Sequence, residues 1–294
     1  MKPDSIRLHC LSLLCLSFAF IAGPVVFAQD SVTQLASSRT PAYLNNDNAN
    51  SPSKPNKLAW PVQCNCGQFA IHSTVAQEKF EAFLPALAGL PIEMRNSLGI
   101  AITEEPIHVV VLESREALDQ YAQKIMPSAP SRRALYIRHR GPGLVLTYFH
   151  PQWINDLRHE CTHALLDASK MRLPVWLDEG MAEYFETLDD TPVCHASHLP
   201  AVQTQIRYGQ VSDLERLEQM DPNTPLTAKD YRDAWSVVAL MLNASQETKS
   251  VYCNYLQDMQ QQRAAGLLSH RIAPKIRSWR DEYNRFFRLN HVEH

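Results

Sequence analysis

The pattern His159-Glu160-Cys161-Thr162-His163 constrains this chain more than any other stretch of its sequence. On a helix, two residues four apart lie on nearly the same face and about one turn from each other, so the pattern predicts a helix if both imidazoles bind one ion. On that helix both imidazoles can converge on one ion while Glu160 lies beside it. Pro151 suits a first helical position, and apolar residues recur around the motif. We therefore expect a metal-binding helix that begins near Pro151.

A third candidate ligand, Glu179, follows sixteen residues after His163 in a second segment with helical periodicity. Glu179, Glu183 and Glu186 recur at i, i+4 and i+7, so they form a row on one helical face. Because large apolar residues surround this row, we expect Glu179 to be a ligand and Glu183 to orient a ligand histidine. Glu186 is expected to be solvated. Asp167 is a further candidate for orienting a ligand histidine, and an ordinary surface aspartate is the alternative.

Two imidazoles and one carboxylate, with one coordination position left for water, are the donor set of a catalytic zinc ion. One zinc ion per chain is therefore the expected cofactor. Glu160 is the candidate general base, which would take a proton from the water and pass it to a leaving amine. This chemistry suits hydrolysis of a peptide bond in a peptide or protein substrate.

The segments His159 to His163 and Trp176 to Phe185 resemble the gluzincin zinc metallopeptidases, the group that contains thermolysin and aminopeptidase N. They are most similar to the compact bacterial peptidase-MA-like domains, many of them of uncharacterised function. The resemblance is specific over residues 150–190. It implies the same zinc ligands and the same general base, Glu160.

The resemblance also implies an outer carboxylate at Glu183 and an oxyanion-stabilising residue on a later helix. Tyr231 lies where such a tyrosine could fall, and a structural tyrosine at a helix start is the alternative. The chain has no Gly-x-Met-Glu-Asn segment of the kind that grips a free amino terminus in the aminopeptidases. An endopeptidase or a narrow specificity is therefore preferred.

Two other functions fit parts of the pattern. A non-catalytic zinc module that binds a peptide or another cell-envelope protein would use the same ligands, and its zinc ion would only stabilise the fold. A di-iron centre would need a second E-x-x-H in a suitable helix, and the sequence offers none. Metal content and turnover distinguish these alternatives from a peptidase.

The first 28 residues combine a sparse basic start, an apolar run and small residues before Gln29. They predict a secretory signal peptide cut after Ala28, with a retained anchor as the alternative. We therefore expect a secreted or periplasmic protein without stable membrane insertion after cleavage. Its 28 basic and 31 acidic residues give a net charge of −3, and this balance argues against a nucleic-acid partner.

Five cysteines follow the predicted signal peptide. A bridge between Cys194 and Cys253 is plausible, and one between Cys64 and Cys66 is less comfortable because so short a loop is strained. A metal role for Cys64 and Cys66 would need partners that the sequence does not reveal. Cys161, on the metal helix, is expected to be a free buried thiol.

The chain is expected to be α+β, with a small mixed sheet followed by a mainly helical half. Residues 29–58 are polar and predict a disordered linker, and residues 59–294 a single domain. The other histidines are expected to be hydrogen-bonded or at the surface, without a second ligand cluster. Among these histidines are His72, His108, His139, His150, His195 and His198. The predicted elements are a helix over Glu78–Leu90, a strand over Ile107–Leu112, a helix over Ser114–Lys124 opened by a Ser cap, a hairpin of Ala134–His139 and Leu144–Phe149, and helices from Pro174 onward.

Overall fold

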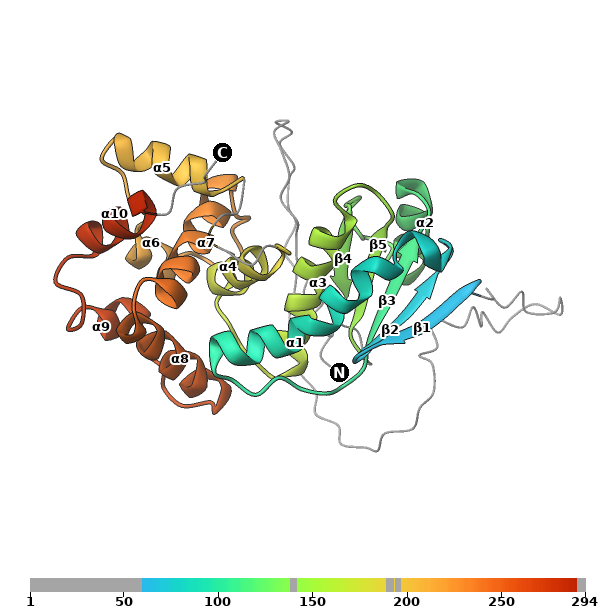
Figure 1. The fold of residues 1–294 in the computed structure, drawn as a ribbon, viewed down its shortest axis with the longest axis horizontal. Coiled ribbons are helices and arrows are strands. Elements are labelled where there is room, and N and C mark those ends of the chain that lie inside the picture. Colours follow the sequence, from blue (N-terminus) through green and yellow to red (C-terminus); the bar gives the residue numbers. More distant parts are fainter. Residues whose placement is uncertain (1–59, 138–141, 189–192, 194–196, 290–294) are drawn as a thin grey trace. The chain divides into compact units, whose positions relative to one another are not determined.

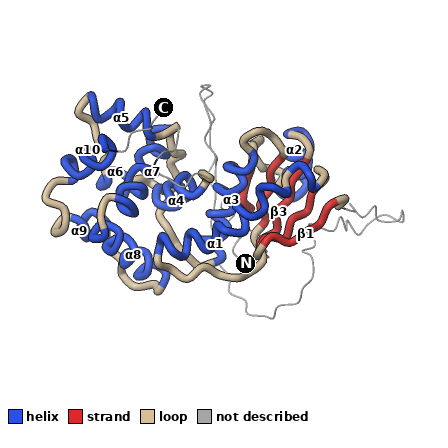
Figure 2. The backbone as a smooth tube through the Cα atoms, in the orientation of Figure 1, coloured by secondary structure: helices blue, strands red, loops and turns tan. Residues whose placement is uncertain are grey.

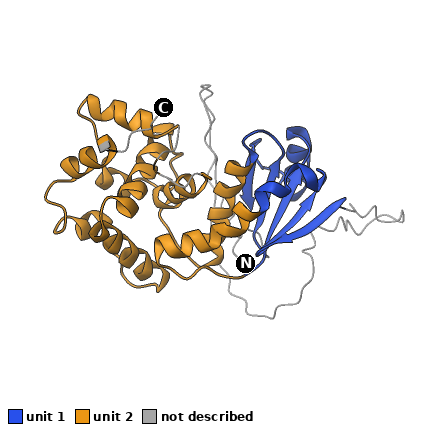
Figure 3. Cartoon of the chain, viewed as in Figure 1, with its two compact units in different colours: residues 1–84, 105–153 blue, residues 85–104, 154–294 orange. Residues whose placement is uncertain are grey.

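The computed structural model describes residues 60–137, 142–188, 193 and 197–289. The fold is α+β, as predicted (Figures 1 and 2). The chain divides into two compact units, residues 1–84 with 105–153 and residues 85–104 with 154–294 (Figure 3). The predicted signal peptide and linker, His139, Cys194 and His195 lie outside the described residues. The single domain over residues 59–294 stays a prediction.

The first unit is built on a mixed sheet of five strands in the order β1-β2-β3-β5-β4. Parallel pairing joins β2 to β3 and β3 to β5, and antiparallel pairing joins the two outer pairs. Every residue of β3 is buried, in keeping with a sequence that is apolar except for His108. The strands are β1 Val62–Cys66, β2 Phe69–Ser73, β3 Ile107–Leu112, β4 Ala134–Ile137 and β5 Leu144–Tyr148. The predicted central strand and the β4–β5 hairpin are confirmed, whereas the β1–β2 hairpin was not predicted.

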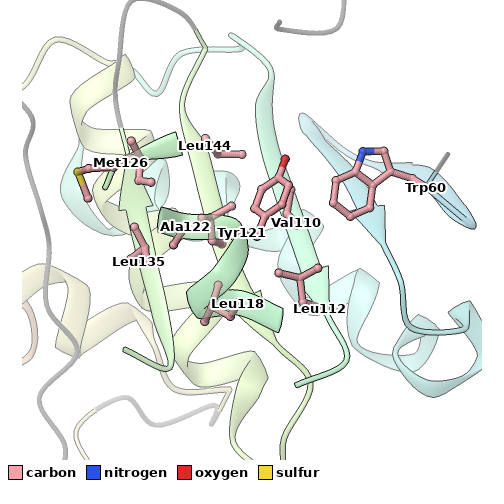
Figure 4. Packing of buried hydrophobic residues seen from close by; sticks show 11 residues of the cluster. Trp60, Val110, Leu112, Leu118, Tyr121, Ala122, Met126, Leu135 and Leu144 are labelled. Carbon is pink, nitrogen blue, oxygen red and sulfur yellow. The ribbon is translucent and has the colours of Figure 1, made fainter. Parts of the chain in front are cut away.

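One face of this sheet is covered by α2, Arg115–Ile125. The helix begins where predicted, because the Ser114 side chain accepts a hydrogen bond from the Ala117 amide at 3.2 Å. Its apolar face packs on the sheet, and Figure 4 shows side chains from both. The buried cluster consists of Trp60, Val110, Leu112, Leu118, Tyr121, Ala122, Met126, Leu135, Ile137, Leu144 and Leu146.

The helix predicted over Glu78–Leu90 is wrong in its bounds. Two short 3-10 turns, Gln77–Lys79 and Glu81–Phe83, come first, and α1 then runs over Leu84–Leu98. Pro85 lacks an amide hydrogen and therefore suits the first turn of a helix, not its interior. The helix continues through Pro91 because Leu87, Leu90, Met94 and Leu98 keep one face buried.

The second unit is helical, as predicted for the chain from Pro174 onward. Its helix α3 begins at Trp153, two residues later than expected, where the Trp153 amide donates to the carbonyl of His150 at 3.0 Å. The helices are α3 Trp153–Ala168, α4 Val175–Phe185, α5 Leu199–Arg207, α6 Leu214–Glu218, α7 Ala228–Asn243, α8 Gln246–Gln260, α9 Leu268–Ile272 and α10 Trp279–Leu289.

Helix α4 is buried on every side, and its closest neighbour is α7. Gly180 permits this approach, because a Cβ atom at Gly180 would lie 2.8 Å from the carbonyl oxygen of Ala234. A helix that is apolar all round except for a few acidic residues can place those residues only in the interior. The acidic side chains of α4 are therefore buried with it.

Neither candidate disulfide is present, because Cys64, Cys66 and Cys253 are thiols in the structure. Cα atoms two residues apart on an extended strand are about 6.6 Å apart, at the upper limit for a disulfide. The Cys66 thiol donates to the carbonyl of Leu84 at 2.8 Å instead. Cys161 is a buried thiol outside any disulfide, as predicted.

Among the residues that the structure describes, no helix combines the length and the apolar character needed to cross a membrane.

Candidate metal centre

Helices α3 and α4 bring the three predicted ligands together in the interior of the second unit. His159 and His163 lie one turn apart on α3, with ring centroids 4.9 Å apart in an edge-to-face arrangement. From α4, Glu179 Oε2 lies 3.4 Å from His159 Nε2 and 3.5 Å from His163 Nε2. The exposed fractions of these residues are 0%, 1% and 4% for His159, His163 and Glu179. The cluster is thus one carboxylate oxygen facing two imidazole nitrogens.

These separations fit a metal ion better than direct hydrogen bonds. Four ligands at about 2.0–2.1 Å from a tetrahedral zinc ion lie about 3.3 Å from one another. A hydrogen bond between the same atoms would be about 2.7–3.2 Å long. The two separations, 3.4 and 3.5 Å, exceed that range and lie near the tetrahedral value, so His159, His163 and Glu179 could together hold a metal ion.

The second nitrogen of each imidazole faces a further carboxylate. Glu186 Oε2 lies 2.9 Å from His159 Nδ1, and Asp178 Oδ1 lies 3.3 Å from His163 Nδ1. Carboxylates in this position fix the ring and leave Nε2 for a metal. The prediction that Glu186 is solvated is therefore wrong, because α4 is buried all round and Glu186 is only 7% exposed. Asp178 was missed, although it immediately precedes Glu179 in the sequence.

Glu183 has a different partner from the one predicted. Its Oε2 lies 2.8 Å from His198 Nε2, while the carboxylate that is hydrogen-bonded to a ligand histidine is that of Glu186. His198 is thus hydrogen-bonded, one of the two roles expected for it. One ligand atom from each of His159, Glu183 and Glu186 also lies within 4.8 Å of the others. Within that second group, the contact of 2.9 Å between His159 Nδ1 and Glu186 Oε2 has the length of a hydrogen bond, so we assign the group to orientation of the ring.

Carboxylates reverse the effect of burial on both ligand histidines. Burial alone lowers the pKa of His159, but the nearby carboxylates of Glu179 and Glu186 raise it well above its usual value. Burial likewise lowers the pKa of His163, and the opposing charges of Asp178 and Glu179 raise it to about 9. The cluster therefore favours positive charge, and a metal ion would replace protons on these rings.

The remaining predicted residues lie on the same helices or on α7. Glu160 is fully buried on α3, directly after His159. Tyr231 is 5% exposed and lies one turn before Ala234 on α7. The catalytic roles of Glu160 and Tyr231 stay predictions. Asp167 is half-buried, and the carboxylate beside His163 is that of Asp178 instead.

Two other histidines form a buried pair in the sheet of the first unit. His72 Nε2 and His108 Nδ1 are 3.2 Å apart, and their rings stack with centroids 5.4 Å apart. A hydrogen-bonded role was expected for both, and the structure confirms it. Within the described part of the chain, every group of three or more candidate metal ligands includes His159.

Two comparisons with known proteins found no match. No protein-family model matches the sequence, and a search of curated proteins gives no match. The resemblance to gluzincins therefore rests on the two motifs and on the cluster that they form.

Proposed function

We propose that this chain is an exported zinc-dependent metallopeptidase of the gluzincin type that hydrolyses peptide bonds. The observation that carries the proposal is the position of Glu179 Oε2, 3.4 and 3.5 Å from the Nε2 atoms of His159 and His163. Two imidazoles and a carboxylate are the ligand set of several zinc peptidases, whose fourth position holds water or substrate. Export rests on the sequence of residues 1–28 alone.

In the proposed reaction, different residues of the chain bind the metal ion, orient its ligands, transfer the proton and stabilise the oxyanion. His159, His163 and Glu179 would hold the zinc ion. Glu186 is hydrogen-bonded to Nδ1 of His159, and the carboxylate of Asp178 faces Nδ1 of His163. When bound, zinc acidifies a water molecule and polarises a carbonyl group. Glu160 would accept the water proton and deliver it to the leaving amine. Tyr231 is the candidate donor to the developing oxyanion.

The direct test is hydrolysis of a peptide library by the zinc-loaded protein and by Glu160→Gln. The amide cannot act as a base, so we expect turnover to fall on the order of 10²- to 10⁴-fold while one zinc per chain is retained. Glu116→Gln, the same change at an exposed position on α2, is the matched control and should keep full activity. Equal rates for the protein and its Glu160→Gln variant would defeat the proposal.

A second candidate, a non-catalytic zinc module that binds a peptide or protein, is favoured by the burial of the cluster. His159, Glu160, His163 and Glu179 are all 4% exposed or less, whereas a substrate must reach a catalytic metal. This candidate predicts zinc binding and loss of stability on chelation, with no turnover on any peptide in the library. Turnover that depends on Glu160 would exclude it.

A further inference from the structure

Arg158, the residue before the first ligand, is an almost fully buried cation, 3% exposed. Its guanidinium has three acceptors in the second unit. Nε donates to the carbonyl of Phe185 at 3.0 Å, Nη1 donates to the carbonyl of Ala86 at 2.7 Å, and Nη2 pairs with Glu93 Oε2 at 2.7 Å. The planar fork of arginine supplies donors in fixed directions, so these contacts restrict the position of each acceptor.

The contact with Phe185 determines how α4 ends. The last carbonyls of a helix have no partner within it, and a cationic side chain there stabilises them. Phe185 is the last residue of α4, and its carbonyl belongs to the peptide group that joins it to Glu186. Arg158 therefore holds the backbone immediately before Glu186.

Two neighbouring residues of α3 thus bind two neighbouring residues at the end of α4. Arg158 contacts Phe185, and His159 contacts Glu186 at 2.9 Å. Helix ends fray, so a side chain just beyond the last turn needs an external contact to stay in one place. The guanidinium provides that contact beside the ring that Glu186 orients.

We propose that Arg158 is a positioning residue, which holds Glu186 on Nδ1 of His159 and so keeps Nε2 directed at the cation site. The inference rests on the metal site of the proposed function but not on catalysis. Loss of such an outer contact typically weakens metal binding about 10- to 100-fold.

The first test needs no metal. In protein labelled with ¹⁵N-histidine, the Nδ1 proton of His159 should give a slowly exchanging signal that disappears in Glu186→Ala. We expect Arg158→Met to remove the same signal, and Glu93→Gln, which leaves both carbonyl contacts of Arg158 in place, to retain it. Persistence of the signal in Arg158→Met would overturn the proposal.

The second test is a double-mutant cycle on zinc affinity. If Arg158 acts through Glu186, Arg158→Met and Glu186→Ala should each weaken zinc binding about 10-fold or more. The double variant should then bind zinc no more weakly than the single variant with the lower affinity. Losses that multiply in the double variant, or unchanged affinity in Arg158→Met, would overturn the proposal. Arg216→Met is the matched control, because it removes an arginine bound to Asp230 and Asp233 and should leave zinc affinity unchanged.

Arg158→Lys serves where the methionine variant does not fold. Lysine keeps the charge but replaces the fork by a single ammonium group, so the Nδ1 signal should weaken and zinc affinity should fall. A lysine variant with the original signal and affinity would contradict the proposed role. Failure of the parent protein to bind zinc would defeat the proposed function, and the ring signal would still decide the role of Arg158.

Discussion

Within the described residues, two pairs of buried histidines differ in their surroundings. His72 and His108 lie on adjacent strands of the sheet, 6% and 9% exposed, and His159 and His163 lie on α3, 0% and 1% exposed. The sheet pair is joined by a contact of 3.2 Å between its own ring nitrogens. The helix pair instead faces a shared carboxylate oxygen at 3.4 and 3.5 Å.

Neighbouring charge decides what burial does to each pair. Burial lowers the pKa of His72, and burial together with the charge of His72 lowers that of His108 to about 4. Carboxylates from α4 outweigh burial at the helix pair and raise both pKa values. Two close buried imidazoles are therefore insufficient for a cation site, and the acidic residues of α4 supply the missing attraction.

The largest expected difference between the pairs is in zinc affinity. Structural zinc sites bind with roughly 10–16 kcal/mol, so loss of one ligand of four should weaken binding on the order of 10²- to 10³-fold. We expect His163→Ala to show this loss and His108→Ala to leave affinity unchanged, as measured by competition with a zinc-binding dye. Equal effects of the two substitutions would remove the distinction between the pairs.

A smaller effect should follow from moving the carboxylate helix. Gly180→Ala places a Cβ atom 2.8 Å from the Ala234 carbonyl, and such overpacking costs about 1–3 kcal/mol. Gly89→Ala, in α1, meets nothing within 4 Å and should be neutral or slightly stabilising. Urea unfolding of both variants measures the difference. A neutral Gly180→Ala would show that α4 has room to shift.

The metal-free protein should lose stability on the alkaline side. The folded-state pKa of His163, about 9, lies above its ordinary value of 6.5. Its protonation therefore stabilises the fold fully below pH 6.5, and this contribution disappears as the pH rises toward 9. Urea midpoints between pH 6 and 9 should fall, and His163→Gln should flatten the slope. For the same reason zinc affinity should rise over this range.

The sheet pair should give the opposite slope on the acid side. The folded-state pKa of His108, about 4, lies below its ordinary value of 6.5, so the unfolded chain binds protons more readily. Stability should fall as the pH decreases from 6.5 toward 4 and should be unaffected above that window. His108→Gln should reduce this acid sensitivity and leave the alkaline slope unchanged. An unchanged acid slope would show that the pair does not control it.

The sequence predicts the ligands of the helix pair better than their surroundings. Helical spacing alone brings His159 and His163 together, and the acidic row in an apolar segment identifies Glu179. The sequence could not reveal that Glu186 is buried, because an acidic residue at a helix end is usually solvated. Asp178 was missed because adjacent helical residues point about 100° apart, and only the crossing of α3 and α4 brings both to the histidines.

The sheet pair shows a limit of a different kind. His72 lies on a five-residue strand that was not predicted, since short strands give weak periodicity. His72 and His108 are 36 residues apart in the chain, and only the parallel pairing of β2 with β3 makes them neighbours. The candidate bridge of Cys194 with Cys253 is absent, since Cys253 is a thiol. Pairing of cysteines depends on positions in space that their spacing in the sequence does not give.

Zinc-edge X-ray absorption of the dialysed protein tests the central claim most directly. We predict one zinc ion per chain with nitrogen and oxygen donors at about 2.0–2.1 Å, including two imidazoles. His72→Ala and His108→Ala should leave this spectrum unchanged, and His159→Ala and His163→Ala should alter it. A protein that retains no zinc, or a spectrum that changes only when the sheet histidines are replaced, would contradict the assignment.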